Sequence, residues 1–394
     1  MSFAGASPAL TSSGGTAGSD AVNGVPIEVA SMFYTGINEP RPTAMNFSFD
    51  GLYFVSAHTD DAVRLIDVGN MVNTDVIVCD AFGVHNVRYT HSSSVVCVAP
   101  RFHLDGHLHL LNTETSQFFG EMAYLNDAES EIVPVANTPV YSTLSQCPTT
   151  DVIGAVVAAK SRLALFHPLI SGCIAATPER SVVGSRACVQ FSRDGHRIAI
   201  GDDHRIAILD RRNLFHSPQV MLENKRVFTM STPPTRCKGV EFSADASRLL
   251  LTSSSGEVVV YDWQRDETVA NYFHGAARRH FVGSADAIGA QHVFPHQATS
   301  PILQLTSSMA GGRHLLVYAG CPSNAVSSAQ QGRLLYELQS KDSDVPVAVA
   351  VNPRLQLVAT AARSITWWAF HSSVMEAYAT PAEACVTAAD GEGG

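Results

Sequence analysis

Apolar residues recur along this chain in short runs, and polar turn residues separate the runs about every ten residues. Residues 187–210, ACVQFSRDGHRIAIGDDHRIAILD, hold three runs rich in Ile, Val, Leu and Phe, separated by Ser-Arg-Asp-Gly and Gly-Asp-Asp-His. Because side chains of a strand alternate between its two faces, each run has the spacing of a β-strand. Asp-Gly suits a hairpin turn, since Gly accepts positive φ and Asp bonds local backbone groups. The pattern predicts an all-β protein.

The same pattern repeats along most of the chain. Its period is about 40–50 residues, which is the length of a propeller blade of four strands. The clear copies share Phe-Ser, two residues that include an Asp, and a β-rich run; they cover 44–67, 187–210 and 238–262. Weaker copies cover 83–112, 138–168, 299–338 and 346–370. We therefore predict a seven-bladed β-propeller, with an open pair of sandwiches as the alternative.

The two ends of the chain differ from the repeats. Residues 27–35, IEVASMFYT, precede the first copy and are β-rich, so we expect them to form the outer strand of the last blade and to close the ring. Segments rich in Ser, Gly, Ala and Thr bury too little apolar surface to fold. The predicted division is a disordered tail at 1–23, a propeller at 24–378 and a disordered tail at 379–394, with insertions near 272–298 and 321–331.

Composition narrows the class of protein. Hydrophobic residues make up 45% of the chain, enough for a large core, but charged residues only 16%, which favours a protein that works inside a complex. A net charge of −10 argues against nucleic-acid binding over the whole surface. The 8 cysteines form no Cys-x-x-Cys pair and sit mostly in apolar runs, as reduced core cysteines do. Neither a signal peptide nor an apolar run of about 18 residues is present, so we expect no membrane association.

Two copies carry more specific residues. The first has Met-Asn-Phe-Ser, Gly-Leu-Tyr and an Asp-Asp turn; the second has Phe-Gly-Val at 82–84 and Tyr-Thr-His at 89–91. The last copy ends in two tryptophans where most repeats carry Trp-Asp. In these residues, over about 40–371, the chain resembles the WD-repeat protein 82 family, the propeller subunit of COMPASS histone methyltransferase complexes and of nuclear type 1 phosphatase complexes that act in transcription termination. The likeness is weak in 113–186 and 272–335.

The resemblance implies a non-catalytic docking subunit in a nuclear chromatin or transcription complex, without a cofactor. Its expected partners are a phosphatase-targeting or a methyltransferase subunit and the phosphorylated tail of RNA polymerase II, with no direct nucleic-acid or membrane contact. The alternative is a WD-repeat adaptor in RNA 3′-end processing or ubiquitin ligation, since propellers have many roles.

The sequence supports a catalytic or metal-binding site less well than it supports a docking subunit. His107 and His109 would share a strand face and could bind zinc, but no second ligand cluster accompanies them. Neither a Gly-x-Ser-x-Gly elbow nor a phosphate-binding glycine loop is present, which disfavours an enzyme. The acidic pairs 60–61 and 202–203 occupy equivalent turns, so we interpret them as turn residues that bond backbone amides.

Charge in the loops predicts one binding surface. The turns between second and third strands, and the links between blades, are acidic in the first two copies and basic in the third to sixth. A basic half-face suits phosphoserine, whose oxygens pair with arginine. The candidate partner-binding residues are Arg41, Lys160, Arg162, Arg186, Arg236, Lys238, Arg278 and Arg279.

Overall fold

The computed structural model describes most of the repeating part of the chain. The described residues are 26–33, 40–101, 106–124, 140–178, 183–216, 218–229, 235–243, 246–254, 257–272, 291–293, 302–307, 313–318, 330–331, 334–340, 348–352, 354–355, 357–361 and 364–370. Within them the protein is nearly all β: the helical pieces are a 3-10 turn, η1 (Ala158–Lys160), and one short helix, α1 (Asn224–Val227). None of the helices in this part is long and apolar enough to cross a bilayer.

Antiparallel sheets of consecutive strands are the unit of the fold. One contains β2 (Pro42–Phe47), β3 (Tyr53–His58), β4 (Ala62–Asp67) and β5 (Val72–Val78). A second contains β14 (Cys188–Phe191), β15 (Arg197–Gly201), β16 (Arg205–Asp210) and β17 (Val220–Glu223). The clear sequence copies give these sheets because turns such as Ser-x-Asp-Gly follow an apolar run and return the chain antiparallel.

Two further groups of four strands join into one sheet. The first group is β6 (Asn86–Tyr89), β7 (Val95–Ala99), β8 (His107–Asn112) and β9 (Gln117–Ala123). The second is β10 (Tyr141–Gln146), β11 (Ile153–Val157), β12 (Arg162–His167) and β13 (Ile170–Ala176). Their outer strands β9 and β13 pair in parallel through Ala123 and Gly172, which gives an eight-stranded sheet.

The fifth and sixth sequence copies form the next sheets. One contains β18 (Cys237–Phe242), β19 (Arg248–Ser253), β20 (Val258–Asp262) and β21 (Glu267–Tyr272), with β25 (Gln330–Gln331) added in parallel to β21. The other contains β22 (Gln291–Val293), β23 (Ile302–Ser307), β24 (Arg313–Tyr318) and β26 (Leu334–Ser340). The end of the predicted 321–331 insertion therefore reaches back to the edge of the preceding sheet.

The N-terminal strand closes the ring, as the sequence predicts. The last sheet contains β27 (Ala348–Val351), β28 (Leu357–Ala361) and β29 (Ile365–Phe370), and β1 (Pro26–Phe33) pairs antiparallel with β29 as its outer strand. The last sheet thus contains strands from both ends of the propeller. Closure of this kind leaves no free seam between the ends of the ring.

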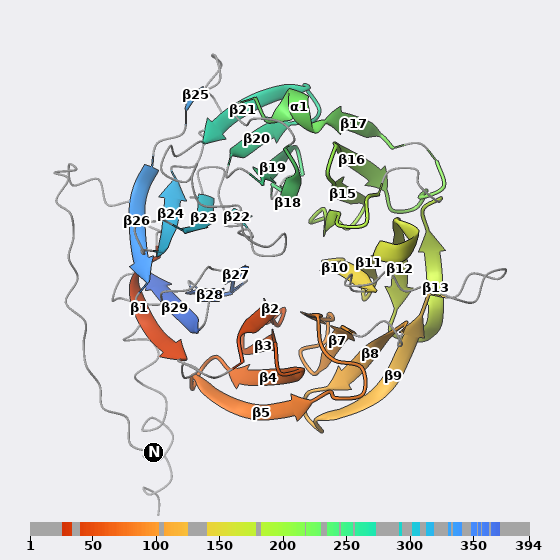
Figure 1. The fold of residues 1–394 in the computed structure, drawn as a ribbon, viewed down its shortest axis with the longest axis vertical. Coiled ribbons are helices and arrows are strands. Elements are labelled where there is room, and N and C mark those ends of the chain that lie inside the picture. The colour runs from red at the N-terminus through yellow and green to blue at the C-terminus, as the bar shows by residue number, and fades with distance from the viewer. Residues whose placement is uncertain are drawn as a thin grey trace, which may run out of the picture.

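The sheets surround a central opening, with the first strand of each group innermost (Figure 1). The inner strands contact one another in the closed order β2, β6, β10, β14, β18, β22, β27 and back to β2. At one rim, called here the upper rim, first and third strands start while second and fourth strands end, as Cys188 opposite Gly201 shows. The other rim is called the lower rim.

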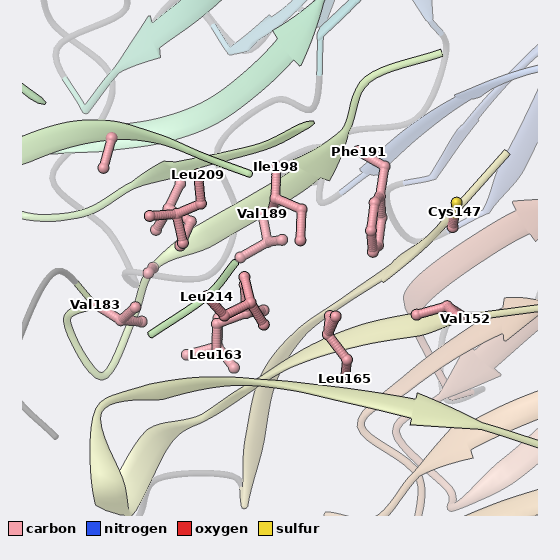
Figure 2. Close-up of a cluster of buried hydrophobic side chains, with 14 residues drawn as sticks. Cys147, Val152, Leu163, Leu165, Val183, Val189, Phe191, Ile198, Leu209 and Leu214 are labelled. Atoms are coloured by element: carbon pink, nitrogen blue, oxygen red, sulfur yellow. The ribbon is translucent and has the colours of Figure 1, made fainter. Parts of the chain in front are cut away.

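The hydrophobic core lies between neighbouring sheets. One cluster, drawn in Figure 2, joins Val156 and Leu165 of the third group to Phe191, Ile198 and neighbouring residues of the fourth. Similar clusters fill the other described interfaces, and Trp367 of β29 packs against Phe47 and Phe54 across the closing seam. Burial between sheets explains why the predicted strands carry large apolar residues on both faces.

Turns at the lower rim also join neighbouring groups. The Asp50 carboxylate accepts a 2.6 Å hydrogen bond from the Ser93 hydroxyl of the second group. Asn352 donates a 2.7 Å bond to the carbonyl of Gly51, which links the last group to the first. Gly51 and Gly195 take positive φ at the turns where the sequence places Asp-Gly.

The fold class is therefore confirmed as an all-β propeller closed by an N-terminal strand. The sheets agree with seven blades if the eight-stranded sheet counts as two, but the count itself stays a prediction. The predicted tails at 1–23 and 379–394, and most of the 272–298 insertion, lie outside the described residues.

Candidate binding surface

Polar side chains connect the inner strands around the central opening. Asn46 of β2 accepts a 2.9 Å hydrogen bond from the Tyr89 amide of β6. Arg88 of β6 donates through Nε to the Leu144 carbonyl of β10 at 3.3 Å. The Thr143 hydroxyl of β10 then donates to the Ala187 carbonyl, at the start of β14, at 2.7 Å. Each inner strand of this half of the ring is thus tied to the next by a side-chain hydrogen bond.

Arg88 and Glu241 add charge to this inner ring. Arg88 is half-buried on β6, and Glu241 is half-buried on β18, three inner strands further round. Burial lowers the pKa of the Arg88 guanidinium, and attraction to the Glu241 carboxylate opposes that change. Arg88 and Glu241 therefore place opposite charges on the inner strands of the ring. Sequence reasoning missed this pair because it examined loop charges alone.

The upper rim carries most of the predicted basic residues. Arg186 lies in the link before β14, and Arg236 lies in the link before β18. Lys238 is the second residue of β18, and Lys160 ends the 3-10 turn between β11 and β12. The structure therefore brings Arg186, Arg236 and Lys238 to the starts of two neighbouring inner strands.

These basic residues differ in their surroundings. Arg186 is exposed, and no ion pair or hydrogen bond holds its guanidinium among the described residues. Arg236, in contrast, is half-buried and its Nε lies 3.1 Å from the Asp203 carboxylate. Arg186 is therefore the better placed of the two to pair with an anionic partner.

Two other predicted residues have structural contacts. Arg162 is half-buried at the start of β12 and donates a 2.8 Å hydrogen bond to the Tyr124 hydroxyl. Arg41 precedes β2, and its backbone exchanges two 2.9 Å hydrogen bonds with Thr59. Both contacts help to hold the upper rim in shape. Arg278 and Arg279 lie outside the described residues.

The acidic pairs are turn residues, as the sequence indicates. Asp61 has a φ of 59° and accepts a 3.0 Å hydrogen bond from the Val84 amide, while its second oxygen pairs with Arg101. Asp202 accepts 2.7 Å bonds from the amides of His204 and Arg205. These carboxylates therefore shape the upper rim and leave little capacity for a separate ligand.

The histidine pair of β8 is divided between surface and core. His107 is exposed, whereas His109 is buried and stacks on Phe82 with ring centroids 3.8 Å apart. Its Nδ1 lies 3.6 Å from the Glu121 carboxylate. Among the described residues, no group of three or more His, Cys, Asp or Glu side chains could hold a metal ion.

A group of exposed apolar residues lies at the lower rim of the first sheet. Phe49 is 46% exposed and Leu52 is 50% exposed, although both belong to a turn. The Phe49 ring lies 4.8 Å from the His91 ring and 5.7 Å from the Arg354 guanidinium. Exposed aromatic residues beside a cation are common in protein interfaces.

Comparisons with known proteins bear on the fold alone. No family model matches the chain, and no curated protein matches it. Many chains of known structure do match. One, from the crystal structure of the mitotic checkpoint complex, has a TM-score of 0.62 and 14% identity, covering 94% of this chain and 98% of that chain. The fold is a WD-repeat β-propeller. Propellers of this type are usually non-catalytic surfaces for protein interaction, because rigid sheets present loops at both rims.

Proposed function

We propose that this protein is a non-catalytic docking subunit of a nuclear chromatin or transcription complex. The observation that carries the proposal is a closed WD-repeat propeller with Arg186 and Lys238 at the starts of adjacent inner strands. The motifs at 82–84 and 89–91 support the nuclear role through their resemblance to the WD-repeat protein 82 family. The solved neighbour belongs to a multi-protein complex, which agrees with protein partners for this chain too.

The proposed ligand of the upper rim is a phosphorylated peptide such as the tail of RNA polymerase II. Phosphate oxygens form bidentate hydrogen bonds with arginine, and lysine adds charge. Arg186 is exposed in the link before β14, and Lys238 is the second residue of the next inner strand, β18. Charge at the rim thus favours an anionic partner even though the whole chain has a net charge of −10.

Charge reversal tests the ligand. We expect the double variant Arg186→Glu and Lys238→Glu to bind a diphosphorylated peptide at least about tenfold more weakly, since each charge-assisted hydrogen bond contributes about 1.5 kcal/mol or more. Arg212→Glu with Arg265→Glu is the matched control, because both arginines are exposed at lower-rim turns. Equal affinity of both double variants, measured by fluorescence anisotropy, would rule out the upper-rim site.

Partner capture tests the complex. The tagged full-length protein is purified from nuclear extract, and its partners are identified by mass spectrometry. Phosphatase-targeting or methyltransferase subunits would support the proposal. Ubiquitin-ligase or RNA 3′-end-processing subunits alone would replace it with the adaptor function.

A further inference from the structure

The inner strands β14 and β18 meet through two thiols. The sulfur of Cys188 on β14 lies 4.0 Å from the sulfur of Cys237 on β18, and the residues are 49 positions apart in the chain. The Cys188 thiol also donates to the Gly201 carbonyl at 3.3 Å, and the Cys237 thiol donates to the Gly239 carbonyl at 3.4 Å. Two inner strands thus face each other through a pair of sulfurs.

Gly201 leaves the space that both sulfurs occupy. A Cβ at this position would lie 2.4 Å from the Cys237 sulfur and 3.0 Å from the Cys188 sulfur. Real Cβ atoms do not approach other atoms so closely. The missing side chain lets the two sulfurs approach each other, and a disulfide needs an S–S distance of about 2.05 Å.

The other described thiols lack such a neighbour. Burial raises the pKa of Cys79 and of Cys97 to about 12, so both stay protonated. Cys147 is fully buried, and Cys173 is half-buried with its thiol 3.0 Å from the Ala175 carbonyl. Among the described residues, Cys188 and Cys237 are therefore the pair that oxidation can join.

We propose that Cys188 and Cys237 form a site of reversible oxidation, at which a peroxide converts the two thiols into a disulfide between neighbouring sheets. The half-buried Cys188 reacts first. Its thiolate attacks one oxygen of hydrogen peroxide, the O–O bond breaks and a sulfenic acid forms. The departing hydroxide takes up the proton that the thiol released and becomes water.

The second step closes the bond. The Cys237 sulfur attacks the Cys188 sulfenic sulfur, the S–O bond breaks, and water leaves with the Cys237 proton. Both sulfurs are oxidised by one electron each, and the peroxide is reduced to two waters. The hydrogen bond with Cys188, followed by burial, raises the pKa of the Cys237 thiol, which fits its role as the second thiol to react.

The disulfide would change how the ring holds together. Inner strands of the first half of the ring are joined by side-chain hydrogen bonds, whereas the oxidised pair joins β14 to β18 covalently. A cross-link that closes a loop of this length restricts the unfolded chain. We therefore expect oxidation to raise the Tm by several degrees.

Mass spectrometry of the full-length protein gives a direct test. The reduced protein is treated with hydrogen peroxide, alkylated and cut after arginine, which releases the one-cysteine peptides 187–193 and 237–248. We expect these two peptides to appear cross-linked and to separate on addition of dithiothreitol. The rise in Tm of the full-length protein should appear together with the cross-link and disappear on reduction. Two separately alkylated peptides at every peroxide dose would overturn the proposal.

Serine variants identify which cysteines form the cross-link and which of them reacts first. Cys237→Ser should abolish the cross-link and leave a Cys188 sulfenic acid that dimedone traps, whereas Cys173→Ser, the control at a half-buried thiol, should leave the cross-link unchanged. Failure of dimedone to label Cys188 in Cys237→Ser would contradict the proposed order of reaction. None of these measurements depends on a nuclear partner.

Discussion

Single residues decide how closely neighbouring sheets of this ring pack against each other, and Gly201 is the clearest case. It sits at the end of β15, opposite Cys188, and a methyl group there would overlap the Cys237 sulfur. Overfilling a packed site usually costs about 1–3 kcal/mol. We therefore expect Gly201→Ala to lower the free energy of unfolding by about this amount, measured by urea denaturation.

A double variant separates crowding from other effects of this substitution. Cys237→Ala removes the sulfur that the new methyl would meet, so Gly201→Ala should cost much less in that background. Equal costs in both backgrounds would show that backbone conformation, and not the sulfur, requires glycine at this position.

His58 makes a second residue-scale prediction, on pH. Its Nε2 lies 2.9 Å from the Ser56 hydroxyl, and burial together with the charge of Arg64 lowers its pKa from 6.5 to about 4. The unfolded chain takes up this proton near pH 6.5, but the folded protein takes it up only near pH 4. The contribution of His58 to stability is therefore complete above pH 6.5 and is lost as the pH falls toward 4.

The expected size of this effect is about 2 kcal/mol between pH 7 and pH 5. His58→Gln keeps a neutral hydrogen-bonding group that does not titrate, so its unfolding free energy should fall by about 2 kcal/mol less over the same interval. Urea denaturation of both proteins at the two pH values measures the difference. An identical pH dependence would place the acid sensitivity in other groups.

Residues with positive φ could be predicted from the sequence only where a turn motif such as Asp-Gly marks them. Gly51 and Gly195 take positive φ as Asp-Gly predicts, but the third clear copy has no glycine there and Ala246 adopts a φ of 56° instead. The thiol pair was hidden by a β-bulge: Cys237 is opposite Ser253 and Gly239 is opposite Thr252. Lys238 is the extra residue: Cys237 lies five residues before Phe242, whereas Cys188 lies three residues before Phe191, so aligning the two copies does not bring the cysteines to the same position.

At the scale of strands and turns, the Asp61 side chain joins the first sheet to the second through a hydrogen bond and an ion pair. Asp61 has a left-handed backbone in the turn between β3 and β4, while its hydrogen-bond partner Val84 precedes β6 and its ion-pair partner Arg101 follows β7. Asp61→Ala loses both contacts and keeps a strained φ, so we expect a loss of about 2–3 kcal/mol in unfolding free energy.

Asn at this position separates the two contacts. Asp61→Asn tolerates positive φ and can still accept from the Val84 amide, so its loss should be about half that of alanine. Asp60→Asn is the control, because Asp60 forms an exposed pair with Arg64, and such pairs contribute about 1 kcal/mol or less. Equal thermal stability of the Ala and Asn variants would mean that only the Arg101 pair matters.

At this scale the sequence predicts where the strands lie better than it predicts which strands of neighbouring sheets pair with each other. Short apolar runs between polar turns mark the strands of the clear copies, because a strand packed between two sheets buries both of its faces. The parallel contacts of β9 with β13 and of β25 with β21 have no such signal. They depend on main-chain groups at strand edges, which any residue except proline can supply.

The whole molecule depends on the seam where the two ends of the propeller meet. β1 is paired with β29, and Trp367 of β29 is fully buried 4.7 Å from the Phe54 ring. Closure by residues 27–35 could be predicted, since an open ring would expose a strand edge. The position of Trp367 across the seam could not, because sequence alone does not set which faces of two sheets meet.

Proline at the seam tests closure directly. Ser31 and Met32 are consecutive residues of β1 opposite Trp367 and Thr366, so two prolines there remove a backbone donor whichever of the two amides faces β29. We expect Ser31→Pro with Met32→Pro to lower the unfolding free energy by about 3 kcal/mol or more and to expose the edge of β29 to association between molecules. Ser12→Pro with Ser13→Pro is the matched control in the predicted tail, and it should leave Tm and elution volume unchanged. If the elution volume and the Tm of the seam variant equal those of the unaltered protein in gel filtration and scanning calorimetry, the packing of Trp367 against Phe47 and Phe54 closes the ring without β1.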